Sequence, residues 1–201
     1  MLGLKQLSFY SLFALALSCS RPASESLGGD VQVQIPLQSS TGKLEFQTVL
    51  LENLESLKAM RGSYAEFYVS PKIENGALAG SEFGGRFAKM GDLWVARDIM
   101  SLTAATLYYH LQELWKLDFQ VGAASLKPKK QQVALSAVIT EQSDRLRNNA
   151  LYEPHSKSLL FVPYSGSDLP ISINSGILAH EHFHSLFDPL VLQPLNKAGF
   201  V

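Results

Sequence analysis

The stretch SGILAHEHFHSLFDPL, residues 175–190, holds three of the chain's five histidines within five positions. Whether these histidines bind a metal decides which fold and function the rest of the chain is expected to have. Asp188-Pro189 predicts the end of a helix, which we expect to run from about 177 to 187. Three polar residues can accept the first backbone N–H groups of this helix: Ser172, Asn174 or Ser175.

His180 and His184 are four positions apart, so they share one face of that helix, about 6 Å apart along its axis. Both imidazoles can reach one ion at the usual zinc–nitrogen distance of roughly 2.0–2.1 Å. Glu181 follows the first histidine, where a carboxylate can accept a proton from metal-bound water, as in other HExxH sequences. His182 lies about 200° around the helix from His180, so we expect it to pack away from the ion.

The composition indicates one globular domain, or one domain with a small accessory part. The chain has 201 residues, of which 46% are hydrophobic and 17% charged, so it can fill a core. Seventeen basic and eighteen acidic residues leave a net charge of −1. The only dense basic run is Lys127–Lys130, so we expect no nucleic-acid partner.

The N-terminus has the pattern of an export signal. Lys5 precedes an apolar run over 7–17 that is too short to span a bilayer as a mature helix. Cys19, the single cysteine, follows Ala16-Leu17-Ser18 and resembles the lipobox of bacterial lipoproteins, in which the cysteine is lipidated. An ordinary secretory signal is the alternative. The small and polar residues of 20–30 predict a flexible tether.

We therefore expect a lipoprotein on the periplasmic or cell-surface side of a bacterial membrane, with the outer membrane favoured. Lipidation of Cys19 would also leave the mature domain without a free thiol.

The first part of the body predicts a β-rich region. Val31, Val33 and Ile35 alternate with glutamines, which is typical of a strand, and the segment after the next turn can pair back as a hairpin. Two further expectations are a strand over 64–69 that ends at Pro71 and a loop-rich stretch over 74–85.

A long helix is predicted from Asp98, its N-cap, to about Leu117. Apolar spacing of three and four residues places the following on its buried stripe: Ile99, Leu102, Thr106, His110, Leu114 and Leu117. His110 is expected to be a satisfied core residue. Strands are predicted over 132–140 and 159–162, and His155, in the turn between them, is expected at the surface.

Three segments resemble the upstream half of a zincin metallopeptidase domain, of the gluzincin type related to thermolysin and fungalysin. They are GDLWVARDIMSLTAATLYYHLQELW (91–115), NNALYEPHSKSLLFVPYS (148–165) and GILAHEHFHSLF (176–187). The resemblance implies an α+β fold, in which a backing helix precedes a mixed sheet whose edge strand binds extended substrate. The HExxH helix follows the sheet.

The resemblance also assigns roles to residues. His180 and His184 become Zn²⁺ ligands, Glu181 becomes the catalytic base, and the substrate edge strand becomes Leu159, Leu160, Phe161 and Val162.

The third zinc ligand departs from the zincin pattern. Phe187 and Leu190 occupy the positions where metzincins have glycine and histidine, so that class is excluded. Gluzincins take a glutamate from a downstream helix, but no glutamate follows Glu181. Asp188 is the only late carboxylate, about 12 Å along a regular helix from His180, and would join only if the helix breaks at Pro189.

The leading hypothesis is a membrane-anchored zinc metallopeptidase that cleaves peptide or protein substrates, completed by a downstream portion or a partner chain. One alternative is a non-catalytic surface lipoprotein whose residual zincin scaffold binds metal or a partner. Another is a binding module in the β-rich region. The expected organisation is a signal peptide at 1–19, a tether at 20–30, a β-rich region at 31–90 and an incomplete zincin domain at 91–201.

Overall fold

The computed structural model describes residues 28–123, 130–141, 144–145, 147–163 and 173–199. The predicted signal peptide, Cys19, most of the tether and Ser172 lie outside these residues. Within the described part of the chain, no helix is long and apolar enough to cross a membrane.

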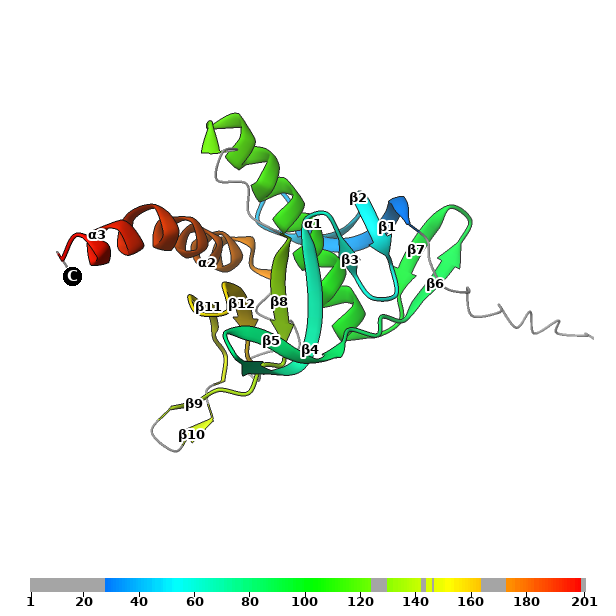
Figure 1. Cartoon of the computed structure of the whole chain (residues 1–201). Coiled ribbons are helices and arrows are strands. Elements are labelled where there is room, and N and C mark those ends of the chain that lie inside the picture. The colour runs from blue at the N-terminus through cyan, green and yellow to red at the C-terminus, as the bar shows by residue number, and fades with distance from the viewer. Residues whose placement is uncertain (1–27, 124–129, 142–143, 146, 164–172, 200–201) are drawn as a thin grey trace, which may run out of the picture.

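The fold is α+β, with two five-stranded sheets and few helices (Figure 1). The first sheet has the order β3 (Arg61–Gly62), β2 (Leu44–Ser56), β1 (Gly29–Gln38), β7 (Leu93–Ala96), β6 (Phe87–Met90). The second has the order β11 (Ala150–Glu153), β12 (Ser158–Phe161), β8 (Gln131–Leu135), β4 (Ala65–Glu74), β5 (Ala77–Glu82). A small ribbon pairs β9 (Thr140–Glu141) with β10 (Asp144–Arg145), and the helices are α1 (Ile99–Gln120), α2 (Ser175–Phe187) and α3 (Gln193–Lys197).

The predicted N-terminal hairpin is confirmed. β1 and β2 pair antiparallel around the turn at 39–43, and Val31, Val33 and Ile35 are all buried. Their side chains point from one face of the sheet into the core, since alternate residues of a strand share a face. β7 then pairs parallel with β1.

The second sheet is mixed, with parallel strands β4, β8 and β12 in its interior and antiparallel strands at both edges. The prediction that a strand ends at Pro71 is wrong, because β4 continues to Glu74 across a bulge between Val69 and Lys72. Ser70, with φ of 44°, and Pro71 lie in that bulge, outside the β4–β5 ladder, so proline's missing N–H breaks no pairing there.

The predicted loop over 74–85 is largely a hairpin. β4 and β5 join at Asn75-Gly76, whose φ angles of 52° and 73° are those of a type I′ turn. Asn-Gly is the strongest short-range hairpin signal. Gly80, Gly84 and Gly85 follow it, and such a density of glycines is also typical of a loop, which is why the sequence predicts one.

α1 begins as predicted, with the Asp98 carboxylate accepting the Ser101 N–H at 2.8 Å. Its buried face differs from the predicted stripe, because Ile99 and Leu117 are about half exposed. The buried residues of α1 include Ala104, Ala105, Leu107, Tyr108, Leu111 and Gln112. A helix covered on several sides need not show one apolar stripe, and its alanines permit close approach of the sheets.

Two polar side chains attach α1 to β2. The Tyr108 hydroxyl donates to the Glu52 carbonyl at 2.9 Å. Gln112 accepts the Glu52 N–H at 2.8 Å and donates to the Leu50 carbonyl at 3.1 Å. The backbone groups that they bind belong to β2 and lie beyond the reach of the short β3. Backbone N–H and C=O groups that a helix covers need such hydrogen-bond partners.

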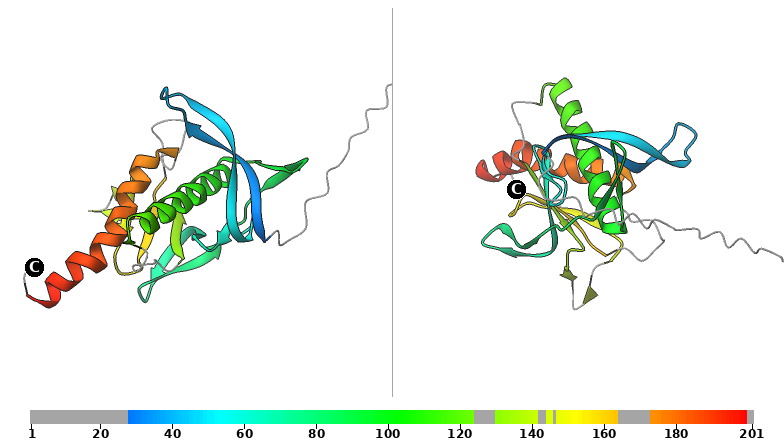
Figure 2. Two further views of the ribbon diagram at one scale, coloured as in Figure 1. Left: turned by 90° about the horizontal axis from the view of Figure 1, so that it is seen from above. Right: turned by 90° about the vertical axis from the view of Figure 1, so that its right-hand side faces the viewer.

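The described residues share one main core. Each sheet combines strands from before and after the boundary predicted at 90/91, and α1 contacts β1, β2 and β7 of the first sheet and β4 of the second (Figure 2). Residues 31–90 are therefore not packed as a separate unit.

α2 ends at Phe187 as predicted, but the chain remains helical through the π-helical segment Asp188–Leu192 and then α3. These three elements run as one rod past the edge of the second sheet (Figures 1 and 2). Neither the π-helical segment nor α3 has a buried residue.

Gly62 lies where α1 meets β2 and β3, and its substitution tests that contact. An alanine Cβ at this position would clash with the Tyr108 hydroxyl and lie 2.6 Å from the Asn53 carbonyl oxygen. We expect Gly62→Ala to lower the free energy of unfolding by about 1–3 kcal/mol or more, measured by urea denaturation. Gly84→Ala is the control: its Cβ would meet nothing within 4 Å, so a change of at most about 0.5 kcal/mol is expected. Equal stability of the two variants would contradict this packing.

Candidate metal centre

α2 begins at a side-chain cap and presents two distinct faces. Asn174 Oδ1 accepts the N–H groups of Gly176 and Ile177 at 3.0 and 3.4 Å, so Asn174 is the cap among the three predicted candidates. The buried residues of the helix are Leu178, Glu181 and His182. His180, Phe183 and His184 are exposed on the opposite side.

His180 and His184 converge. Their Nε2 atoms lie 3.1 Å apart, and the two rings are nearly perpendicular with centroids 4.6 Å apart. Two nitrogens bound to one tetrahedral ion at roughly 2.0–2.1 Å are separated by about 3.3 Å. That value is close to the 3.1 Å between the two Nε2 atoms, so the separation of the imidazoles is compatible with a shared zinc ion.

A catalytic zinc needs three protein ligands, and His180 and His184 would be two of them. No group of three histidine, cysteine, aspartate or glutamate side chains in the described ranges could hold a metal. Asp188 does not join the pair, because the helix continues past Pro189 without the break that would carry its carboxylate toward them. Its Oδ2 instead accepts from the Gln193 side-chain amide at 2.9 Å.

Glu181 lies between the helix and the second sheet. It is only 8% exposed, and its Oε2 accepts the backbone N–H of Tyr152 at 2.8 Å. β11 is the last strand of that sheet, and this N–H points away from β12. The carboxylate is thus held at the open edge of the sheet, one residue from His180 in the chain.

The strand that was expected at the substrate edge does not lie at an edge of the sheet. Leu159, Leu160 and Phe161 form β12, which pairs with β8 on one side and β11 on the other. They and Val162 are at most 4% exposed. A continuous apolar run is typical of an interior strand, whereas the more mixed sequence Ala150–Glu153 forms the edge.

His182 packs away from the pair, as predicted. It is 5% exposed, and its Nε2 lies 2.7 Å from Asp118 Oδ2 near the end of α1. His155 is exposed, which confirms its predicted surface position, and its Nδ1 lies 2.9 Å from Glu153 Oε1.

His110 differs from the predicted satisfied core residue. Its Nε2 is buried, with no hydrogen-bond partner among the described residues. Burial lowers the pKa of this imidazole, and Glu113 opposes the shift, so desolvation dominates and favours the neutral ring.

The hairpin that positions β11 closes on Glu153. Its carboxylate accepts from the Ser156 N–H and hydroxyl at 2.5 and 2.6 Å, and from the His155 N–H at 3.1 Å. Ser156 also hydrogen-bonds to Ser158 at the start of β12. Burial raises the pKa of Glu153, but the hydrogen bonds from Ser156 and His155 together lower it to about 2.

Beside this hairpin the Tyr152 phenol is a weak acid. Burial, then the charges of Asp188 and Glu153, raise its pKa to about 12. The side chain therefore remains protonated at any ordinary pH.

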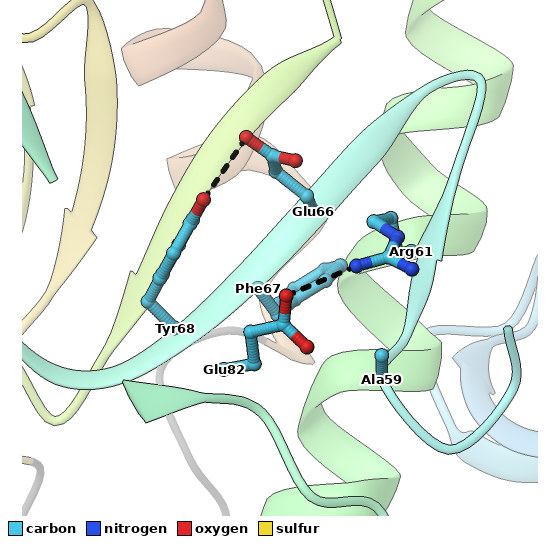
Figure 3. A pocket seen from close by; sticks show the side chains of 6 residues that line it. All are labelled: Ala59, Arg61, Glu66, Phe67, Tyr68 and Glu82. Atoms are coloured by element: carbon cyan, nitrogen blue, oxygen red, sulfur yellow. Dashed lines mark hydrogen bonds and ion pairs between the residues drawn. The ribbon is translucent and has the colours of Figure 1, made fainter. Parts of the chain in front are cut away.

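A shallow depression over β4 and β5 includes no residue of α2 (Figure 3). Its volume is about 10 Å³, far below the roughly 300–1,000 Å³ of small-molecule pockets. Arg61 Nη1 pairs with Glu82 Oε1 at 3.1 Å, and the Tyr68 hydroxyl donates to Glu66 at 3.2 Å. These groups satisfy one another, so the depression adds nothing to the metal centre.

Sequence reasoning missed two partners of the HEHFH segment. Asp118 lies just past the predicted end of the long helix but within α1, where an acidic residue near the end opposes the helix dipole, a weak sign of a specific role. The Tyr152 N–H carries no signal in the sequence, since any residue in an edge strand presents such a donor. No protein-family model, curated protein or solved structure matches this chain.

Glu153 makes the hairpin's stability depend on pH. Because its pKa in the folded protein lies below the ordinary value of 4.5, its contribution is present above that value and is lost as the pH falls toward 2. We expect Glu153→Gln to reduce the free energy of unfolding by about 1–3 kcal/mol at pH 7, and by much less near pH 2.5.

Urea denaturation of both proteins across this range is the measurement. The exposed Glu45 on β2 provides the control, and Glu45→Gln should change stability by at most about 0.5 kcal/mol throughout. A penalty for Glu153→Gln that stays constant from pH 7 to pH 2.5 would contradict the role given to this carboxylate.

Proposed function

We propose that the chain is a zinc-dependent metallopeptidase of the zincin type, tethered through Cys19 outside the cytoplasm of a bacterium. The observation that carries the proposal is the convergence of His180 and His184 at 3.1 Å on the exposed face of α2. Glu181, between them in the sequence, is held at the edge of the sheet. Membrane attachment rests on the N-terminal sequence pattern alone.

The two histidines would hold a zinc ion, which when bound supplies Lewis acidity toward water and a substrate carbonyl. The chain's own contribution is then orientation and proton transfer. Glu181 would accept a proton at its carboxylate and pass it to the leaving amine, the general acid–base role. The described residues would supply two protein ligands, and a third would come from outside the described residues.

β11 is the strand best suited to bind an extended peptide. It has the free edge of the second sheet, and an added strand could pair with its outward N–H and C=O groups. The Tyr152 N–H is one such donor and currently binds Glu181. Peptide binding at this edge would place a carbonyl close to the carboxylate, which is the arrangement that hydrolysis needs.

A second candidate is favoured by the missing third ligand. A surface lipoprotein with a residual zincin scaffold could bind metal through His180 and His184 without turnover. The two functions differ in one result: this candidate predicts zinc binding without hydrolysis even when a third ligand is supplied.

The test is zinc content together with peptide hydrolysis, for the chain alone and for the chain supplied with a third ligand. We expect Glu181→Gln to retain zinc and lose about 10²–10⁴-fold in hydrolysis, because an amide cannot accept the proton. His184→Ala should lose zinc. The matched control is His155→Ala, an exposed histidine on the β11–β12 hairpin, which should keep both.

Hydrolysis that survives Glu181→Gln unchanged would remove the carboxylate as the base. A wild-type chain that binds no zinc would reject both candidates.

A further inference from the structure

We infer that the outer face of the first sheet, the face turned away from α1, docks on the lipid bilayer to which the chain is tethered. The inference rests on the tether through Cys19 that the proposed function includes, and it does not depend on the metal centre. It assigns a role to β1, β2, β6 and β7, which the proposed function leaves without one.

The strand register shows which side chains share the outer face. Val33 and Trp94 are paired across β1 and β7, and both are buried in the main core together with residues of α1. Successive residues of a strand point to opposite faces, so the residues on either side of these two point outward. One outward row across the sheet consists of Leu50, Gln32, Leu93 and Met90.

The outer face is apolar and carries no charge. In the paired parts of β1, β2, β6 and β7 every outward residue is uncharged, and the polar ones are Thr48 and three glutamines. Four of the apolar ones are between 41% and 65% exposed: Leu44, Phe46, Leu50 and Met90. A sheet face that stays in water is ordinarily polar, whereas an exposed apolar patch marks an interaction surface.

The start of β1 brings this face close to the anchor. Cys19 lies ten positions before Gly29, the first residue of β1, so the chain between them can span at most about 36 Å. The outward row at Gln32 is only about 10 Å along the strand from Gly29. A short tether keeps the bilayer at an effective concentration on the order of millimolar, so even a weak contact can orient the body.

The chemistry of the face fits lipid and not an ionic partner. Outward apolar side chains such as Phe46 and Met90 can enter the boundary between headgroups and acyl chains, with a strength that follows the apolar area buried. The outward glutamines can remain hydrated among the headgroups. Because the face has no lysine or arginine, we expect it to accept neutral phospholipid and to be insensitive to salt.

Docking at this face would leave the candidate metal centre uncovered. α2 and α3 lie at the other end of the molecule from β6 and β7 (Figures 1 and 2). A bilayer against the first sheet would therefore not cover the imidazole pair on α2.

The Phe46→Trp variant of the mature, lipidated protein tests the contact in phosphatidylcholine vesicles with and without brominated acyl chains. We expect a blue shift of its emission and a loss of fluorescence in the brominated vesicles, beyond the background of Trp94 and Trp115, at low and high salt alike. The matched control is Phe183→Trp on α2, which should stay unquenched. The two phenylalanines are 61% and 56% exposed.

Substitutions on the same face separate docking from tethering. In the Phe46→Trp background, Leu44→Gln and Leu50→Gln should each weaken the contact about 10-fold, because glutamine buries less apolar surface than leucine. Quenching should then decrease, while the urea midpoint stays unchanged because both leucines are exposed. Ile73→Gln, at a residue 45% exposed on β4 of the second sheet, should keep full quenching.

Three results would overturn the inference. Unquenched emission from the lipidated Phe46→Trp variant rejects the contact and leaves the proposed function intact. Emission that turns blue only as the protein density on the vesicles rises shows a second copy on this face, which also rejects the bilayer. A mature chain without lipid on Cys19, by mass spectrometry, removes the tether from the proposed function and the inference with it. Quenching in a chain that binds no zinc supports the inference and rejects the metallopeptidase.

Discussion

The structure depends on the burial of α1 against both sheets. A helix enclosed in this way cannot rely on water for its polar groups, so most of its buried polar side chains bind partners in the elements around it, with His110 Nε2 an exception among the described residues. Tyr108 and Gln112 do so with the backbone of β2, and Asp118 does so with His182 of α2. The middle of α1 thus binds the first sheet, and the C-terminal end of α1 binds α2.

The placement of α2 follows from that arrangement. One side of the helix carries the residues that bind the body, and the opposite side carries the imidazole pair and the aromatic rings of Phe183 and Phe187, which stack 5.7 Å apart. Beyond Phe187 the rod contributes nothing to the core. The imidazole pair therefore faces outward, away from the core.

Much of this arrangement could be predicted from the sequence, and the failures have physical causes. The alternation at Val31–Ile35 and the Asp98 cap are local signals, and the structure bears them out. The spacing of His180 and His184 is also local, and it places the two rings side by side. Local patterns cannot show which strand lies at the edge of a sheet. The sequence therefore predicts an edge strand at β12, whereas β11 is the edge strand in the structure. The contacts of Asp118 and Tyr152 with α2 depend on how α1, α2 and β11 pack together. Residue spacing within a single segment does not predict that packing.

The central claim is that His180 and His184 bind one ion together. X-ray absorption at the zinc edge of the metal-loaded, full-length chain measures this directly, because imidazole rings give a characteristic scattering pattern. The account predicts two imidazole nitrogens per zinc at roughly 2.0–2.1 Å, with both lost when the two histidines are replaced by alanine. A zinc shell without imidazole, or one unchanged by those replacements, would contradict it.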